Sequence, residues 1–192
     1  MSEIKKQSWK PGTLIYPLPA VLVSCGATPE EYNMLTIAWT GTICTDPPMC
    51  YISVRKERHS YEIIRRTGEF AINLTTEAMA RATDWCGVRS GRNENKWEAT
   101  GLTPMTTSHI SAPIIAESPL SICCKVRQVV ELGTHDMFIA DIVAVYADDT
   151  LLDEKGKLHM SRAGLCAYAH GEYFALGRRI GGFGFSAKKK RK

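Results

Sequence analysis

The sequence predicts a mainly β protein whose strands form a closed or nearly closed β-barrel with helical insertions. Runs rich in valine, isoleucine and aromatic residues recur in both halves of the chain, whereas helical patterns are short and confined to its middle. The 192 residues, of which 44% are hydrophobic and 23% charged, are enough for one domain with a full core. Because neither a repeat nor a linker interrupts the pattern, we expect a single domain over residues 1–187 and a basic tail over residues 188–192.

The first strands are predicted on both sides of a proline turn. Val21–Cys25 is apolar and rich in β-branched residues, which is typical of a strand. Residues 33–39 form a second such run, and Asp46-Pro47-Pro48 then turns the chain into a third run at residues 49–54. We expect the second and third runs to pair as neighbouring antiparallel strands.

Short helices are predicted in the middle of the chain. Apolar residues at helical spacing indicate one helix over residues 61–68, which a glycine closes. A second helix is expected to start at an N-cap provided by Thr75 or Thr76 and to stop at Gly87. A third, short helix is expected over residues 97–101. These helices provide the insertions in an otherwise β-rich chain.

The second half predicts a meander of strands. Residues 69–74 form a strand between the first two helices, and two long runs follow at residues 120–132 and 137–146. The polar connection at residues 133–136 separates the two long runs, and shorter strands are expected near Leu158 and over residues 165–168. Many strands of moderate length favour a barrel over a doubly wound sheet.

Charge and cysteine content restrict the classes of function. The net charge is +4, but residues 188–192 contribute five positive charges, which leaves the remaining chain near −1. No segment approaches the ~18 apolar residues that a membrane-spanning helix needs, so we expect a cytoplasmic protein without membrane contact. Seven cysteines without C-x-x-C spacing fit reduced, buried thiols. For Cys44 a redox role stays open beside that structural one.

Protein-based metal or nucleophilic chemistry finds little support. The five histidines lack the spacing of a zinc site, and no G-x-S-x-G signature places a nucleophile beside a base. Gly182–Ala187 matches a dinucleotide-binding fingerprint, but the chain ends too soon for the helix and strand that should follow. His135, in a polar connection between two strands, is the candidate functional histidine, although a lone loop histidine is more often structural.

A basic segment after the third strand run predicts a phosphate site. Arg55 can bind phosphate through two parallel hydrogen bonds, and Lys56 adds a point charge. Ser53 and Ser60 can donate hydroxyl hydrogen bonds, and Ser60 opens a helical pattern whose first amides can hold an anion. A solvated strand end competes evenly with this interpretation on residue types alone.

The order and spacing of several blocks decide between these two interpretations. The blocks are residues 33–39, 46–48, 52–61, 70–74, 90–92 with 96–97, 101–104, and 170–174 with 176–177. Together they resemble the flavin reductase-like, FMN-binding split-barrel family, close to its flavoredoxin branch. The resemblance covers nearly the whole chain and implies a homodimeric split β-barrel of Greek-key type, with FMN at or near the subunit interface.

The resemblance also implies roles for individual residues. The segment along the isoalloxazine ring and ribityl chain corresponds to Ala38, Trp39, Thr40, Gly41 and Thr42. Contacts with the phosphate correspond to Ser53, Arg55, Lys56 and Ser60. The strand that holds Asn73 passes near the ring, and His135 matches a histidine that faces the nicotinamide side of the flavin.

Three functions follow from this resemblance and from the tail. The first is an NAD(P)H-dependent flavin reductase, in which hydride passes to flavin N5 while the protein positions the reactants. The second is a flavoredoxin-like electron carrier that keeps FMN bound and exchanges electrons with a redox protein. The third, a nucleic-acid-binding module, is disfavoured because the cationic run is confined to the tail rather than spread with aromatic residues over one face.

Overall fold

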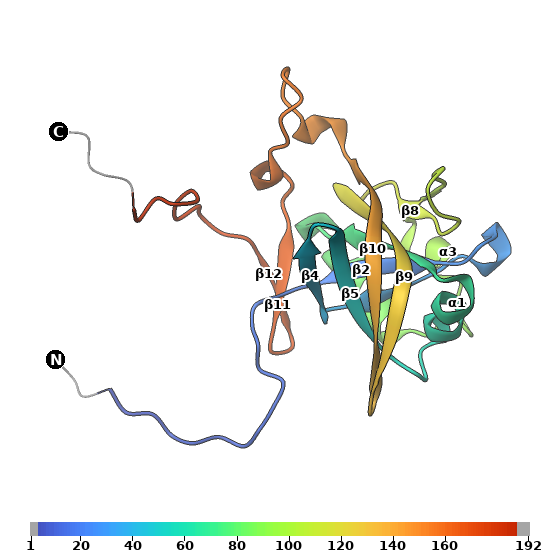
Figure 1. Cartoon of the computed structure of the whole chain (residues 1–192), viewed down its shortest axis with the longest axis horizontal. Coiled ribbons are helices and arrows are strands. Elements are labelled where there is room, and N and C mark those ends of the chain that lie inside the picture. The colour runs from blue at the N-terminus through green and yellow to red at the C-terminus, as the bar shows by residue number, and fades with distance from the viewer. Residues whose placement is uncertain (1–3, 188–192) are drawn as a thin grey trace.

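The computed structural model describes residues 4–187 and shows an antiparallel sheet that coils into a barrel (Figure 1). Seven strands pair in the order β3-β2-β6-β9-β10-β5-β4. Their bounds are β2 (Val21–Cys25), β3 (Asn33–Ile37), β4 (Thr40–Thr45), β5 (Pro48–Arg55), β6 (Glu69–Leu74), β9 (Leu120–Leu132) and β10 (His135–Ala147). The prediction of a mainly β barrel is therefore confirmed. Residues 188–192, which include the predicted basic tail, lie outside the described residues.

The barrel is split between β3 and β4, which follow each other in the chain but lie at opposite edges of the sheet. The predicted pairing of residues 33–39 with residues 49–54 is wrong, because the first run divides at Ala38 and Trp39. Its first part pairs with β2, whereas β4 pairs with β5. The Ser53 amide donates to the Trp39 carbonyl over 2.9 Å and extends the β4/β5 pairing by one residue up to the bend.

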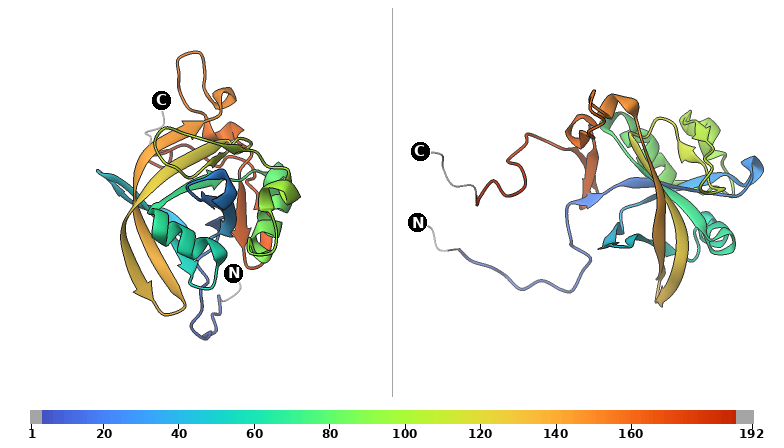
Figure 2. Two further views of the ribbon diagram at one scale, coloured as in Figure 1. Left: turned by 90° about the vertical axis from the view of Figure 1, so that its right-hand side faces the viewer. Right: turned by 45° about the horizontal axis from the view of Figure 1, so that its top comes forward.

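The long hairpin of β9 and β10 forms the central part of the barrel wall and ends in a tight turn (Figure 2). Gly133, at φ 56°, adopts the left-handed conformation that glycine tolerates best. The polar connection is shorter than expected, because His135 already pairs with Arg55 on one side and Leu132 on the other. Two register shifts bend the long strands, as β-bulges do.

Three helices pack on the sheet, α1 (His59–Thr67) against the barrel core and α2 (Ala80–Val88) and α3 (Lys96–Thr100) against the other face of β2 and β3. Glycines with positive φ follow α1 and α3 as predicted. The expected cap of the second helix is wrong, because the Thr75 hydroxyl donates to the Ala20 carbonyl over 2.5 Å and Thr76 makes no side-chain cap. Gly87 lies inside α2 and lets it pack on Thr36, whose Cβ would stand 3.3 Å from an added methyl.

Side chains along β5 point alternately into the barrel core and outward toward the candidate site. Cys50, Ile52 and Val54 are buried inside the barrel, while the intervening side chains point outward. The same alternation on β10 buries Asp136 and turns His135 outward. As a result Ser53, Arg55 and His135 share the outer face of two paired strands.

A small sheet flanks that outer face. It consists of β1 (Leu18–Pro19), β11 (Cys166–Ala169) and β12 (Glu172–Ala175), and it confirms the expected strand near residue 165. Outside the two sheets lie a β7/β8 pair (Pro104–Met105 and Ile114–Ile115) and the 3-10 turns Pro29–Glu31, Glu77–Met79, Asp149–Leu151 and Met160–Arg162. Residues 4–15 and 176–187 extend from the small-sheet side of the molecule (Figures 1 and 2). Within residues 4–187 no helix has the length and hydropathy needed to cross a bilayer.

Candidate functional site

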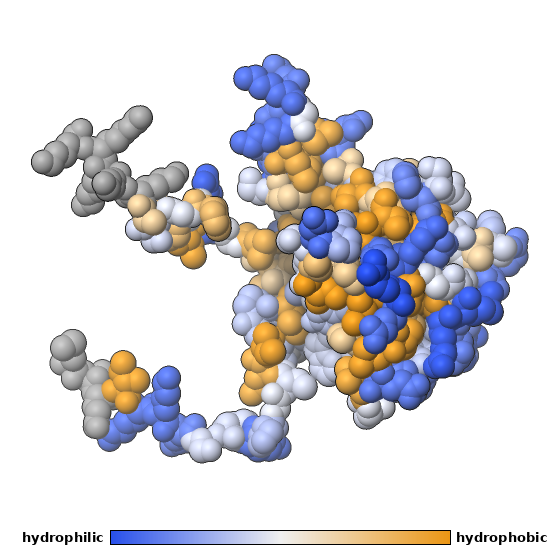
Figure 3. Space-filling model, viewed as in Figure 1, coloured by the Kyte–Doolittle hydropathy of each residue, from blue (hydrophilic) through white to orange (hydrophobic). Residues whose placement is uncertain are grey.

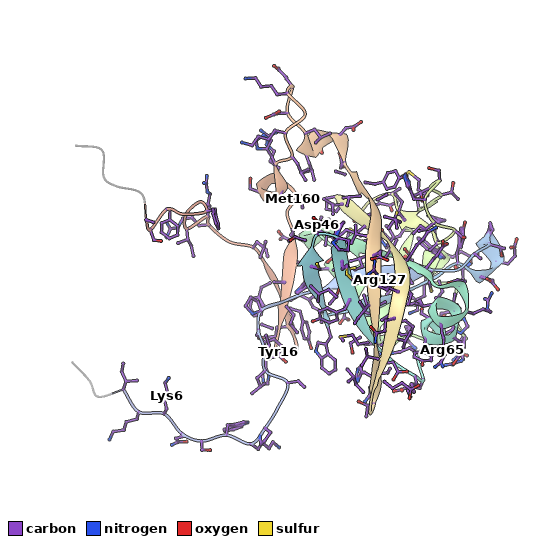
Figure 4. All side chains as sticks on the ribbon, in the orientation of Figure 1. Lys6, Tyr16, Asp46, Arg65, Arg127 and Met160 are labelled. Carbon is purple, nitrogen blue, oxygen red and sulfur yellow. The ribbon has the colours of Figure 1, made fainter. Side chains whose placement is uncertain are left out.

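A cavity of about 390 Å³ lies between the barrel and the small sheet, and we call it the tryptophan cavity. Its barrel side is formed by Ala38, Trp39, Ser53, Arg55 and His135, all of which the sequence assigned to the site. The opposite side includes Asp84 of α2 and the tyrosines Tyr16, Tyr168 and Tyr173. Tyr16 lies where the N-terminal segment joins the small sheet (Figure 4). Fold topology thus brings five predicted residues together from two strands and one bend.

Two aromatic rings in tilted contact line the barrel side of this cavity, with an angle of 43° between their planes. The ring centroids of Trp39 and His135 lie 4.6 Å apart, and the indole remains 37% exposed. The Nδ1 atom of His135 lies 2.9 Å from the Thr134 hydroxyl, which fixes the orientation of the imidazole. Burial and the nearby Arg55 lower the pKa of His135, so the neutral ring is favoured at pH 7. The exposed indole face and the neutral, hydrogen-bonding imidazole suit a planar conjugated ligand.

A second cavity of about 390 Å³ adjoins the first and shares Leu35, Arg55 and Arg58 with it. We call it the arginine cavity. Its cationic side chains are Arg55, Arg58, Arg89, Arg92 and Lys96, whereas Glu57 is its only carboxylate within the described residues. Such a concentration of positive charge favours an anionic ligand, and phosphate in particular matches guanidinium geometry.

The start of α1 faces the arginine cavity. His59 and Ser60 both line it, and the first amides of a helix have no partner within the helix. Ser60 is buried, and its Oγ atom accepts a 2.7 Å hydrogen bond from Nδ2 of Asn33. Burial, Arg92 and Lys96 lower the pKa of His59, in that order, which reflects the positive potential of the cavity.

Sequence reasoning missed four cationic residues of the arginine cavity, namely Arg58, Arg89, Arg92 and Lys96, and Lys96 is the most deeply buried of them. Its side chain is buried, its Nζ atom donates to the Cys86 carbonyl over 2.7 Å, and it takes part in none of the ion pairs found within residues 4–187. Burial lowers the pKa of Lys96. A buried ammonium without a carboxylate partner is costly, and an anion in the cavity would offset that cost. The block at residues 90–97 was its sequence signal.

Two residues that were predicted to contact the cofactor have other partners in the structure. The Nζ atom of Lys56 lies 3.4 Å from Oδ1 of Asp136 and 3.8 Å from Oε2 of Glu131, so it faces the β9/β10 hairpin and lines neither cavity. Asn73 is fully buried in the core, where its amide donates to Leu22 and accepts from Ile115 over 2.9 Å each. The assignment of the Asn73 side chain to the cofactor is therefore corrected to a structural role.

The β4 residues of the predicted site stand apart from both cavities. The Thr40 hydroxyl donates to the Tyr51 carbonyl over 2.6 Å, and Gly41 packs against the Tyr51 ring. Thr42 is exposed on the edge strand. The thiol of Cys44 contacts the Asp46 carbonyl at 3.4 Å and lines neither cavity. The interruption between β3 and β4 thus places Ala38 and Trp39 at the tryptophan cavity and leaves the β4 residues Thr40–Thr45 outside it.

Comparison with known proteins agrees with this geometry. Residues 13–177 match the flavin reductase like domain family. A flavoredoxin of Desulfovibrio vulgaris (Miyazaki F) is 32% identical, and a flavoredoxin from Methanosarcina acetivorans is 25% identical. Each superposes with a TM-score of 0.87 over 96% of this chain and 100% of its own. The FMN reductase (NADH) RutF of Pseudomonas syringae pv. syringae is 24% identical over 108 residues, 54% of this chain and 56% of the relative.

Proposed function

The chain belongs to the flavin reductase like domain family, and from this membership we propose that it binds FMN as a redox cofactor. The ring would occupy the tryptophan cavity and the phosphate the arginine cavity. One observation carries this proposal: an aromatic wall adjoins a cavity with five cationic side chains, and Arg55 belongs to both. A ligand with a flat conjugated end and a phosphate end fits that pair of cavities.

The residues of the two cavities divide the work of holding FMN. Lys96, Arg58 and the Ser60 hydroxyl would hold the phosphate. Trp39 and His135 would bound the ring, and the neutral imidazole would present its free edge to it. When bound, FMN supplies the hydride- and electron-accepting chemistry. The chain itself then contributes binding, orientation and electrostatic stabilisation, without a protein nucleophile.

We further propose that a reduced nicotinamide nucleotide delivers the electrons. The name of RutF, an FMN reductase that uses NADH, supports this donor. The partial exposure of Trp39 also supports this donor, because it leaves room beside the bound flavin ring for a second planar group. The electrons would continue to released flavin or to another acceptor.

An electron carrier with stably bound FMN is the second candidate. The similarity to the two flavoredoxins favours this candidate, because it covers 100% of each flavoredoxin chain. The similarity to the FMN reductase covers only 56% of that relative. In this case the electron donor would be a redox protein. For both candidates we propose a homodimer in the cytoplasm, and the location is supported by seven free cysteines.

Anaerobic stopped-flow absorbance separates the two candidates. The protein reconstituted with FMN is mixed with NADH or NADPH, and loss of flavin absorbance is followed. Bleaching within about a second, the range of typical turnover, establishes a reductase and identifies its donor. If neither nucleotide bleaches the flavin while dithionite does, the chain is a carrier. If the protein does not bind FMN, the proposal is wrong for both.

A further inference from the structure

A fully buried carboxylate lies directly behind the site. Asp136 is on the inner face of β10 and has no solvent exposure, whereas His135 before it faces the tryptophan cavity. An isolated buried carboxylate is costly, so its partners carry information about its role. Those partners come from α1 and from the segment that follows β5.

Three side chains surround the Asp136 carboxylate. The Tyr61 hydroxyl donates to Oδ2 over 2.5 Å, and Nη1 of Arg65 donates to the same hydroxyl oxygen over 2.8 Å. Lys56 forms an ion pair with Oδ1 at 3.4 Å. Burial opposes ionisation of Asp136, but Tyr61 and Lys56 outweigh it and lower the pKa of the carboxyl. Arg65 lies on α1 (Figure 4).

Asp136 and its two partners Tyr61 and Lys56 are each next in sequence to a residue of the proposed FMN site. Asp136 follows His135, Tyr61 follows Ser60, and Lys56 follows Arg55. His135 and Asp136 are neighbours on β10 and point to opposite faces, so the contacts of Asp136 on the inner side fix His135 through the shared backbone. Tyr61 on α1 and Lys56 just beyond β5 restrain Ser60 and Arg55 through the peptide bonds that join each pair. The cluster joins the hairpin, the start of α1 and the end of β5 behind the phosphate and the ring.

We propose that Asp136 is a positioning residue that clamps the phosphate-binding segment of residues 55–60 against the β9/β10 hairpin. The inference rests on the proposed binding of FMN. Lys56, in this arrangement, acts on the phosphate site through Asp136 rather than by direct contact. Two of the three links lead to phosphate-binding residues, so the loss of Asp136 weakens recognition of the phosphate more than that of the ring.

Titration of the full-length protein with FMN and with riboflavin, which lacks the phosphate, tests the clamp. Asp136→Asn keeps the shape of the side chain and removes its charge. We expect the FMN dissociation constant to rise about tenfold or more, because a charged hydrogen-bonding partner is lost, and that of riboflavin to rise by less than about threefold. Tyr61→Phe keeps the aromatic ring, whose centroid lies 5.5 Å from that of Phe138, and removes only the hydroxyl. It should shift the ratio of the FMN and riboflavin dissociation constants in the same direction, and it serves as the test if Asp136→Asn does not fold.

The matched control is Asp141→Asn on the same strand. Asp141 pairs with Arg127 at 2.8 Å on the outside of the hairpin (Figure 4), and we expect its substitution to leave the ratio unchanged. Lys56→Gln distinguishes an indirect role from direct phosphate contact. Its effect on FMN affinity should be largely absent in the Asp136→Asn background, whereas additive effects mean that Lys56 binds phosphate itself.

Two results overturn the clamp. One is a parallel loss of FMN and riboflavin affinity in Asp136→Asn and Tyr61→Phe, and the other is a loss of melting temperature with unchanged affinity for both. If the wild-type protein binds neither flavin, the proposed function falls together with the clamp. If it binds FMN and the variants keep its ratio, only the clamp is wrong.

Discussion

Among single residues, Lys96 gives the sharpest test of the proposed phosphate site. Its ammonium group is buried beside the Cys86 carbonyl and has no carboxylate partner within residues 4–187. We predict that Lys96→Met raises the FMN dissociation constant by about tenfold to a hundredfold, the range for losing a charge-assisted hydrogen bond. Lys125→Met, which removes the 3.3 Å ion pair with Glu69 at the surface, is the control and should leave FMN affinity unchanged. Fluorescence titration measures both.

The pH dependence of stability gives Lys96 a second readout without flavin. Its pKa in the folded protein is lowered from 10.5, so between the lowered value and 10.5 the unfolded chain binds more protons. Stability therefore rises with pH in this window. The difference in unfolding free energy between wild type and Lys96→Met should shift in favour of wild type as pH approaches 10.5, as urea denaturation can show. A constant difference would mean that the pKa of Lys96 is not lowered in the folded protein without FMN.

Between elements, the loop before α3 is held against β3 and α1 at Gly91. A methyl group added at Gly91 would collide with the side-chain amide of Asn33, which orients Ser60 through a 2.7 Å hydrogen bond. We predict that Gly91→Ala lowers FMN affinity about tenfold and destabilises the protein by about 1–3 kcal/mol, the usual cost of overpacking. Gly177→Ala, with open space around it, is the matched control. Unchanged FMN affinity in Gly91→Ala would show that Ser60 does not depend on Asn33.

At the same scale, local patterns predicted the strands and helices well, but not the partners of their side chains. β2, β6 and β9 have the expected bounds because their apolar runs end at turn residues. The pairing of β3 was wrong because the bend at Trp39 depends on closure of the barrel. Asn73 was predicted to bind the cofactor and has a structural role, whereas Lys96 was not predicted and lines the arginine cavity. Both errors have the same cause, because burial and hydrogen-bond partners depend on tertiary neighbours that no local sequence pattern contains.

For the whole molecule, the two terminal segments are unusual in exposing large apolar side chains. Trp9 and Ile15 are 76% and 84% exposed on residues 4–15, and Ile180 and Phe183 are 88% and 106% exposed on residues 176–187. Figure 3 shows hydrophobic colour along much of the C-terminal segment and near both ends of the N-terminal segment, which is otherwise blue or pale. Burying a side chain of this size stabilises an assembly by about 1.5–3 kcal/mol. We propose that a second copy of the chain covers them in the homodimer.

Truncation decides whether the C-terminal segment serves dimerisation. Deleting residues 178–192 removes Ile180, Phe183 and Phe185, and we predict a shift from dimer to monomer because the apolar contact with the second copy is lost. Deleting residues 188–192 alone removes five positive charges and should leave the dimer intact. Light scattering coupled to size-exclusion chromatography measures the mass of both variants. A dimer that survives the longer deletion would show that the C-terminal segment is dispensable for dimerisation, whereas dissociation after the shorter deletion would assign the contact to the tail.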